Sequence, residues 1–484
     1  MKMAARRKTA ILLPLALLLA NFLNMVGIVV LPKIIDPSQF ALFSLASSSG
    51  LFLIAVLYEW NRITIMRYSV AVDPEEMSRR RSVLKRANIV TSIVLLVISI
   101  VAYSFSSNWY ALVFSMACLF AVSQAMFEAR QAFFRADFLD RNYAVSLVSR
   151  ALLGFSLLCA IGYLSNDAFF VMCGWAASYV VVLFFTRSLA GKSVPQPTDW
   201  KTLRFLLGFG VGVAMAAIAN TLLSPLVRLL AAEFITLSDS GKLMLAMDIS
   251  QKIVGVIGVS INILTLQATF RAREFGEHEV VRQRIGMQLS VVVATILPAV
   301  VGFISVQDGF TFIFIPDAYR DVFLPNIAWC MVAAGLLGFR AFALDSIFIV
   351  LGRPYTGLVG PLVTAAVTIA SVFALTSLED PSALLFSKAL CFGVSAGSIS
   401  SIIVARRLFH FSLDLPNLVR ITVAAITMYA SIQLVRFDNA IVDFAASVAV
   451  GAFVYGAILL ASNAFGSHKL LRLALARVKR GNVT

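Results

Sequence analysis

Charged residues are scarce in this 484-residue chain: they make up 13% of it, against about 25% in soluble globular domains. Hydrophobic residues make up 60%, so water cannot be the main solvent of the fold. A bilayer can be, because about 20 mostly apolar residues cross its hydrocarbon core as a helix. The composition therefore predicts an all-α integral membrane protein with little chain left for a soluble domain.

Cysteine and histidine are also few, and their placement argues against several kinds of site. The five cysteines lie in apolar segments without a CxxC spacing, and the three histidines lie far apart in polar connectors. The segment Gly191-Lys192-Ser193 lacks the first glycine of a phosphate loop. We therefore expect no metal, no cofactor and no catalytic residue, and we expect that the chain is not an enzyme.

Apolar runs between polar, Gly and Pro residues predict about fourteen membrane spans. The predicted spans are 10–34, 41–62, 88–106, 109–129, 144–164, 168–187, 205–232, 241–269, 287–306, 326–351, 356–378, 383–405, 418–436 and 440–462. The first is too long for a signal-peptide core and has no cleavage site, so we expect a retained helix.

The predicted spans fall into groups of six, six and two. An N-terminal six-helix lobe (1–187) is followed by a Pro-containing polar linker (188–204) and a C-terminal six-helix lobe (205–405). Two additional helices (418–462) and a basic cytoplasmic tail (463–484) complete the chain.

A weak internal repeat relates the two six-helix lobes. KIIDPSQFALFSLA at 33–46 aligns at an offset of 200 with EFITLSDSGKLMLA at 233–246, with four identical positions. Both segments lie at the turn between the first two helices of a six-helix set. This placement indicates a transporter built from two pseudo-symmetric lobes.

Lysine and arginine are distributed unevenly over this topology. With both termini on one side, the loops on that side hold 31 of the 40 basic residues and the opposite loops hold five. The positive-inside rule then places both termini in the cytoplasm. This topology also accounts for the net charge of +15, so we expect no nucleic-acid partner. The outer loops are short, which argues against a membrane enzyme such as a glycan polymerase or ligase.

Some basic residues cannot leave the bilayer. They are Arg150, Lys252, Arg340 and Lys388, with Arg228 near the outer end of its helix. Each central Arg or Lys costs about 2.5–3.5 kcal/mol to insert, so such residues normally face a watery cavity or a partner. If they line one cavity, its preferred cargo is anionic, for example a lipid pyrophosphate.

Structural pairing is the alternative interpretation of these charges. Asp248 precedes Lys252 by one helical turn, which favours an ion pair between them. Asp345 follows Arg340 by five residues and lies off the same α-helical face. Snorkelling to the membrane surface would accommodate Lys388 and Arg228. The sequence leaves a cationic cavity and scattered ion pairs equally open.

Short segments across the chain resemble those of a known transporter family. VVLPKIIDPSQFALFS (29–44) resembles the first outer turn of the bacterial polysaccharide exporters, which are lipid-linked oligosaccharide (O-antigen type) flippases of the multidrug/oligosaccharidyl-lipid/polysaccharide (MOP) superfamily. LRF (203–205) with Gly208 and VRLL (227–230) look like the opening of that family's second lobe, and GRP (352–354) is similar to its inner turn. Ala41 stands where the family usually has Gly, and Val227 where an Asp commonly precedes the Arg.

The resemblance implies a transporter that alternates between inward-open and outward-open states in the bacterial cytoplasmic (inner) membrane. Its implied cargo is a polyprenyl-pyrophosphate-linked oligosaccharide for surface polysaccharide, and its implied partners are membrane lipids and other membrane proteins of polysaccharide assembly. The five cations would hold the anionic cargo, with Asp248 and Asp345 in pairing or ion-coupling roles. A multidrug cation antiporter of the same fold and a flippase for the peptidoglycan lipid precursor remain alternatives.

Overall fold

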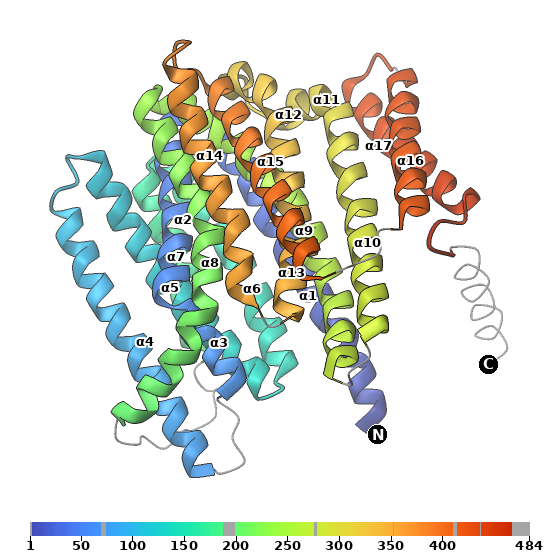
Figure 1. Cartoon of the computed structure of the whole chain (residues 1–484). Coiled ribbons are helices and arrows are strands. Elements are labelled where there is room, and N and C mark those ends of the chain that lie inside the picture. The colour runs from blue at the N-terminus through green and yellow to red at the C-terminus, as the bar shows by residue number, and fades with distance from the viewer. Residues whose placement is uncertain are drawn as a thin grey trace. The chain divides into compact units, whose positions relative to one another are not determined.

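The computed structural model describes residues 2–68, 74–186, 199–274, 278–351, 353–409, 414–435 and 437–466, and these form helices and no strand (Figure 1). The first nine helices are α1 (Lys2–Val30), α2 (Pro37–Leu57), α3 (Glu59–Tyr68), α4 (Pro74–Tyr103), α5 (Trp109–Ala136), α6 (Asp140–Ser165), α7 (Ala168–Phe185), α8 (Trp200–Phe234) and α9 (Leu237–Glu274). They are followed by α10 (His278–Ser305), α11 (Gln307–Phe314), α12 (Asp317–Phe339), α13 (Asp345–Val350), α14 (Val359–Thr376), α15 (Ala383–Leu408), α16 (Leu415–Leu434) and α17 (Ala440–Ala461). The predicted all-α fold class is confirmed.

Thirteen helical segments in the described part of the chain are long and apolar enough to cross a membrane. They correspond to every predicted span except 241–269. That span coincides with the 38-residue helix α9, much of whose side-chain structure lies outside the described residues. Large apolar side chains cover the outer surface of these helices, for example Ile100 on α4 (71% exposed) and Phe453 on α17 (75% exposed). Such exposure suits lipid rather than water.

Short polar residues fix where several of the helices begin. Asn108 accepts a hydrogen bond from Tyr110 N (2.9 Å) at the start of α5, and Asp167 accepts one from Phe169 N (2.7 Å) at the start of α7. Asp199 caps α8, and hydrogen bonds from the Thr202 hydroxyl and the Lys201 N–H lower the pKa of its carboxyl group. Helix α8 therefore begins inside the predicted linker 188–204, whose residues 188–198 lie outside the described part of the chain.

Packing divides the chain into two compact units, unit 1 (1–249 and 354–389) and unit 2 (250–353 and 390–484). In unit 1, α1 packs on α6, α2 packs on α5 and α8, and α6 packs on α7. In unit 2, α10 packs on α12 and α16, and α16 packs on α17. These boundaries differ from the predicted lobes, and the division into six, six and two helices stays a prediction. Most of the predicted tail, 467–484, lies outside the described residues.

Helices α2 and α9 approach each other closely in unit 1. A Cβ atom added at Gly241 would lie 1.9 Å from Pro37 O and 3.1 Å from Ala41 N. Gly241 and Ala41 are the residues that the 200-residue repeat aligns with each other. Only glycine permits this contact. The resembled family usually has Gly at the position of Ala41, and in this chain the glycine is found instead at the aligned position of α9, Gly241.

Replacing Gly241 with Ala should destabilise the protein, because the added methyl group must push the α2 backbone away. We expect a loss of about 1–3 kcal/mol, as for overpacked cores. The matched control is Gly456→Ala on α17, where an added Cβ meets no atom within 4 Å. Thermal unfolding of the purified proteins in one detergent measures both. Equal unfolding temperatures for the two variants would show that the α2–α9 contact is not tight.

Candidate functional site

The five predicted intramembrane cations differ widely in exposure. Arg150, Arg228 and Arg340 are at most 5% exposed. Lys388 is half-buried, and Lys252 is exposed. Arg150, Arg228 and Lys388 belong to unit 1, whereas Lys252 and Arg340 belong to unit 2. The three arginines are therefore held within the fold, and the two lysines are the accessible cations of the set.

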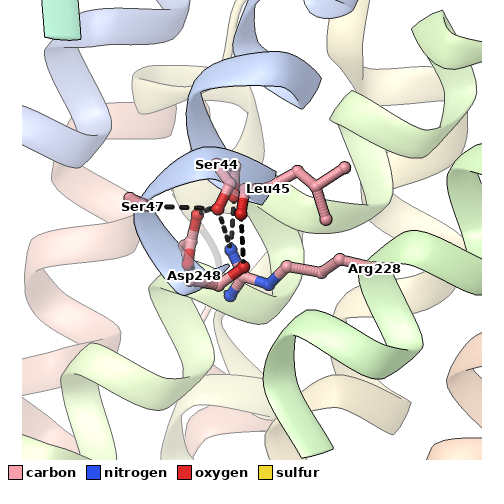
Figure 2. Close-up of polar contacts among 6 residues, drawn as sticks. Ser44, Leu45, Ser47, Arg228 and Asp248 are labelled. Carbon is pink, nitrogen blue, oxygen red and sulfur yellow. Dashed lines mark hydrogen bonds and ion pairs between the residues drawn. The ribbon is translucent and has the colours of Figure 1, made fainter. Parts of the chain in front are cut away.

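Arg228 joins three helices, as Figure 2 shows. It extends from α8, and its Nη2 donates to Asp248 Oδ1 on α9 at 2.7 Å. Its Nη1 donates to both the hydroxyl and the carbonyl oxygen of Ser44 on α2, the latter at 3.2 Å. The Ser44 hydroxyl in turn donates to Asp248 Oδ2 at 2.7 Å. We call these three residues the Arg228 cluster.

The Arg228 cluster corrects one expectation from the sequence and adds a partner to another. The expectation that Arg228 snorkels is wrong, because its side chain is 2% exposed and its guanidinium binds an acid inside the fold. Asp248 binds Arg228 on the neighbouring helix, and its expected pair with Lys252 on its own helix stays a prediction. Val227 is 1% exposed, so the position where the resembled family carries an acid packs in the core, and α9 supplies the acid instead.

The arrangement of the Arg228 cluster is favourable because each charge is compensated. An arginine removed from water costs several kcal/mol unless a carboxylate and additional hydrogen bonds satisfy it. Asp248 supplies the opposite charge, and Ser44 supplies two acceptor oxygens and one donor. The Ser44 carbonyl also accepts from the Ser47 hydroxyl at 2.9 Å, so this turn of α2 directs its polar groups to the cluster.

Arg150 is buried among aromatic and amide side chains. Its guanidinium carbon lies 4.0 Å from the centre of the Tyr179 ring and 5.5 Å from the centre of the Trp175 ring. Its Nη1 donates to Asn24 Oδ1 at 2.9 Å, and its Nη2 donates to the Tyr179 hydroxyl. Cation–π contact with two rings stabilises a desolvated guanidinium, so α1, α6 and α7 meet around Arg150.

A chain of hydrogen bonds leads from Arg150 to an acid. The Tyr179 hydroxyl donates to Gln124 Oε1 at 3.1 Å, and Gln124 Nε2 donates to Glu128 Oε1 at 2.7 Å. Glu128 Oε2 lies 4.0 Å from Arg62 Nε on α3, and Arg62 also forms an ion pair with Glu59. A small cavity beside Glu128 and Arg62 is lined further by Asn61 and Asn88, among others. The charge of Arg150 is thus coupled through neutral groups to Glu128.

Sequence reasoning missed this network because it considered only cations. The signal that could have found it is Glu128 itself, an acid within the predicted span 109–129. Gln124 precedes Glu128 by one turn of α5, which a local pattern can reveal, whereas the proximity of Asn24 and Tyr179 to Arg150 follows only from tertiary packing.

Arg340 and Asp345 come together through a local change in helix type. Residues 340–344 form a π-helix, in which hydrogen bonds run from i to i+5, so residues five apart lie on one face. Arg340 Nε consequently lies 4.0 Å from Asp345 Oδ2. The expectation that Asp345 lies off the face of Arg340 is wrong, because it assumed an α-helix. Gln288 Nε2 donates to Phe342 O at 2.9 Å and satisfies a carbonyl within the π-helix.

The described residues contain no group of three or more His, Cys, Asp or Glu side chains placed to hold a metal ion. What the arrangement provides is buried, compensated charge at helix contacts, together with two accessible lysines. Within each unit, such contacts can change between two helix arrangements, since each buried charge has a defined set of partners to lose.

Comparison with solved structures identifies the fold. No protein-family model matches the sequence, and no curated protein matches it. Among solved structures, the chain is similar to the lipid II flippase MurJ in an inward closed conformation. The two share 13% sequence identity, the match covers 94% of this chain and 99% of that chain, and the TM-score is 0.74. It is also similar to an inward-facing multidrug resistance MATE family transporter of the MOP superfamily, with 15% identity over 85% of this chain and 95% of that chain and a TM-score of 0.57.

A MOP superfamily transporter from Pyrococcus furiosus Vc1 is similar at 14% identity over 86% of this chain and 96% of that chain, with a TM-score of 0.52. The fold that the resemblance implied is therefore confirmed: the chain has the fold of MOP superfamily transporters over nearly its whole length.

Removing one member of the Arg228–Asp248 pair should cost more than removing both. Asp248→Asn leaves a buried guanidinium without its counter-charge, and we expect a loss of about 3–5 kcal/mol. The double variant Arg228→Met/Asp248→Asn removes the buried charge and should recover most of that loss. Thermal unfolding of the wild type, both single variants and the double variant closes the cycle. Strictly additive losses would contradict a direct ion pair.

Proposed function

We propose that the protein is a flippase that moves a polyprenyl-pyrophosphate-linked oligosaccharide across the bacterial cytoplasmic membrane by alternating access. The observation that carries this proposal is the excess of cations within the spans of a chain whose fold matches a lipid II flippase over 94% of its length. The fold supports a transporter, and the cations favour an anionic cargo, because carboxylates or phosphates compensate charges that hydrocarbon cannot.

The orientation in the membrane follows from the distribution of basic residues. We propose that both termini are cytoplasmic, because the loops on their side hold 31 of the 40 lysines and arginines. The turns 31–36 and 235–236 then face outward, and so do the ends of the helices near the Arg228 cluster. The connection 353–358 faces the cytoplasm.

The cargo-binding role falls first on Lys252 and Lys388. Both lie within predicted spans, Lys388 half-buried in unit 1 and Lys252 exposed in unit 2, and an ammonium group binds phosphate as a mobile point charge. Arg150 and Arg340 are buried in this state and would contact cargo only if their surroundings rearrange. The lipid tail of the cargo stays in the bilayer while its pyrophosphate and sugars occupy the polar path.

The Arg228 cluster supports a closed outer side. Ser44 belongs to the first predicted lobe, whereas Arg228 and Asp248 belong to the second. Opening would separate Ser44 from the pair but leave Arg228 and Asp248 together, so no buried charge loses its counter-charge. The cost is a few hydrogen bonds, each worth about 0.5–1.5 kcal/mol net, which is compatible with a transition between two states. Tyr110 on α5 bridges the same two lobes through Glu233 and would separate as well.

Flipping of the peptidoglycan lipid precursor is the second candidate function. The likeness to the lipid II flippase, with a TM-score of 0.74, favours it, and the pyrophosphate of that cargo has the same chemistry. A multidrug cation antiporter ranks below both, because cations rather than acids predominate among the charges within the spans.

Deletion of the gene separates these candidates. The proposal predicts loss of a surface polysaccharide and accumulation of its lipid-linked repeat unit on the cytoplasmic leaflet, in cells that still grow. An arrest of growth with accumulated peptidoglycan precursor would support the second candidate. Drug sensitivity with normal surface glycan would support the antiporter.

Removing either accessible lysine should weaken cargo binding. Lys252→Gln and Lys388→Gln each delete a charge-assisted hydrogen bond, worth about 1.5–3 kcal/mol, so apparent affinity should fall by about tenfold or more. Surface-glycan export in the deletion strain, normalised to the amount of inserted protein, measures this. The control is Lys201→Gln, an exposed lysine at the start of α8. Normal export in the double variant Lys252→Gln/Lys388→Gln would exclude a cargo role for both.

A further inference from the structure

A pocket in unit 2 lies apart from all the intramembrane cations discussed above. It has a volume of about 240 Å³ and lies where the end of α10 and the start of α11 meet the turn between α16 and α17. In the proposed orientation this end of unit 2 faces outward. The volume is just below the range of about 300–1,000 Å³ typical of pockets for drug-sized ligands, so it suits a smaller organic molecule.

The lining of the pocket combines acids, amides, a hydroxyl and aromatic rings. The chemistry is carried by Asp308, Asp443, Gln307, Tyr429, Phe444 and Ser447. Tyr429 is 45% exposed, so its ring is available to a ligand. Ser447 is 4% exposed, and Gln307 Oε1 is buried without a hydrogen-bond partner among the described residues. A buried amide oxygen without a protein partner, in the wall of a cavity, needs a ligand or water to satisfy it.

The pocket is held open by rigid packing. A Cβ atom at Gly309 would lie 3.4 Å from Phe444 Cβ, so α11 lies close against α17. Phe444 also packs with Phe314, with ring centres 5.9 Å apart. The Tyr455 hydroxyl donates to Ala294 O at 2.6 Å and fixes α17 to α10. These contacts make a preformed cavity, which lowers the cost of binding a ligand.

The side chains that line the pocket select against two classes of ligand. Two carboxylates, those of Asp308 and Asp443, line the pocket and disfavour an anionic ligand. A Ca²⁺ ion holds its oxygen ligands at about 2.3–2.6 Å, and a cavity of 240 Å³ is far larger than such a site.

An uncharged sugar ring can form hydrogen bonds with the polar side chains that line the pocket. Its hydroxyls can donate to the carboxylates of Asp308 and Asp443, and they can exchange hydrogen bonds with Gln307 and Ser447. Its apolar face can lie on the ring of Tyr429, as amphipathic ligands do at aromatic side chains. We propose that this pocket binds one uncharged pyranose residue of a glycan on the outer side of the membrane. The inference rests on the proposed orientation but not on the proposed cargo lipid.

The test is ligand binding to the full-length protein in lipid nanodiscs, measured by saturation-transfer difference NMR. The probes are methyl β-D-glucopyranoside and the corresponding methyl glucuronide. We expect saturation transfer to the glucoside and little to the glucuronide. Asp308→Asn and Ser447→Ala should each weaken glucoside binding by about tenfold, with thermal unfolding used to confirm that the variants are folded. Asp438→Asn is the matched control, because Asp438 is exposed near the same end of unit 2 and does not line the pocket.

The outcomes that would overturn the proposal are distinct from failure of the proposed function. Absence of glucoside binding, equal binding of the glucuronide, or binding unchanged by Asp308→Asn and Ser447→Ala would each exclude a sugar site. Displacement of the glucoside by calcium chloride at low concentration would indicate a cation site instead. Because binding is measured without transport, a protein that exports no lipid-linked glycan can still bind the probe, and the reverse also holds.

Discussion

The buried guanidinium of Arg228 is the interaction on which the contact between α2, α8 and α9 depends. A charged group in hydrocarbon needs compensating groups around it, and for Arg228 those groups come from adjacent helices. Asp248 supplies the acid from α9, and Ser44 supplies acceptors from α2. The close approach at Gly241 brings the α2 and α9 backbones near enough for these short side chains to meet. The resulting contact is specific, because its geometry satisfies a charge that otherwise has no favourable environment.

The same constraint organises the other charges of the chain. Arg150 is compensated by aromatic rings, an asparagine and a chain of hydrogen bonds that ends at Glu128. Arg340 is compensated by Asp345 across a π-helix. In this state the buried arginines therefore hold helices together, whereas Lys388 is half-buried and Lys252 is exposed. A transporter with this division can change its helix contacts without exposing an uncompensated charge to lipid.

Hydropathy predicted the spans well because each span is a local property of about 20 residues. The sequence predicted less well which charged residues pair with each other. The sequence offered Lys252 as the partner of Asp248, and no local pattern predicted the ion pair of Asp248 with Arg228 on another helix. It separated Arg340 from Asp345 because a period of 3.6 residues was assumed, and no residue pattern announced the π-helix. It overlooked Glu128 because only cations were followed. The repeat at 33–46 and 233–246 was a weak signal, yet it marked the two segments that meet at Gly241.

The most direct test of the Arg228 cluster as a reversible contact is labelling of one buried position from outside the cell. Met244 lies on α9 between Gly241 and Asp248 and is 0% exposed. In a chain whose five native cysteines are replaced, Met244→Cys should react slowly with a membrane-impermeant maleimide added to intact cells. Ser44→Ala removes the hydroxyl that joins α2 to the pair, so labelling should become about fivefold faster, as expected for about 1 kcal/mol. An unchanged labelling rate in the Ser44→Ala variant would contradict the account.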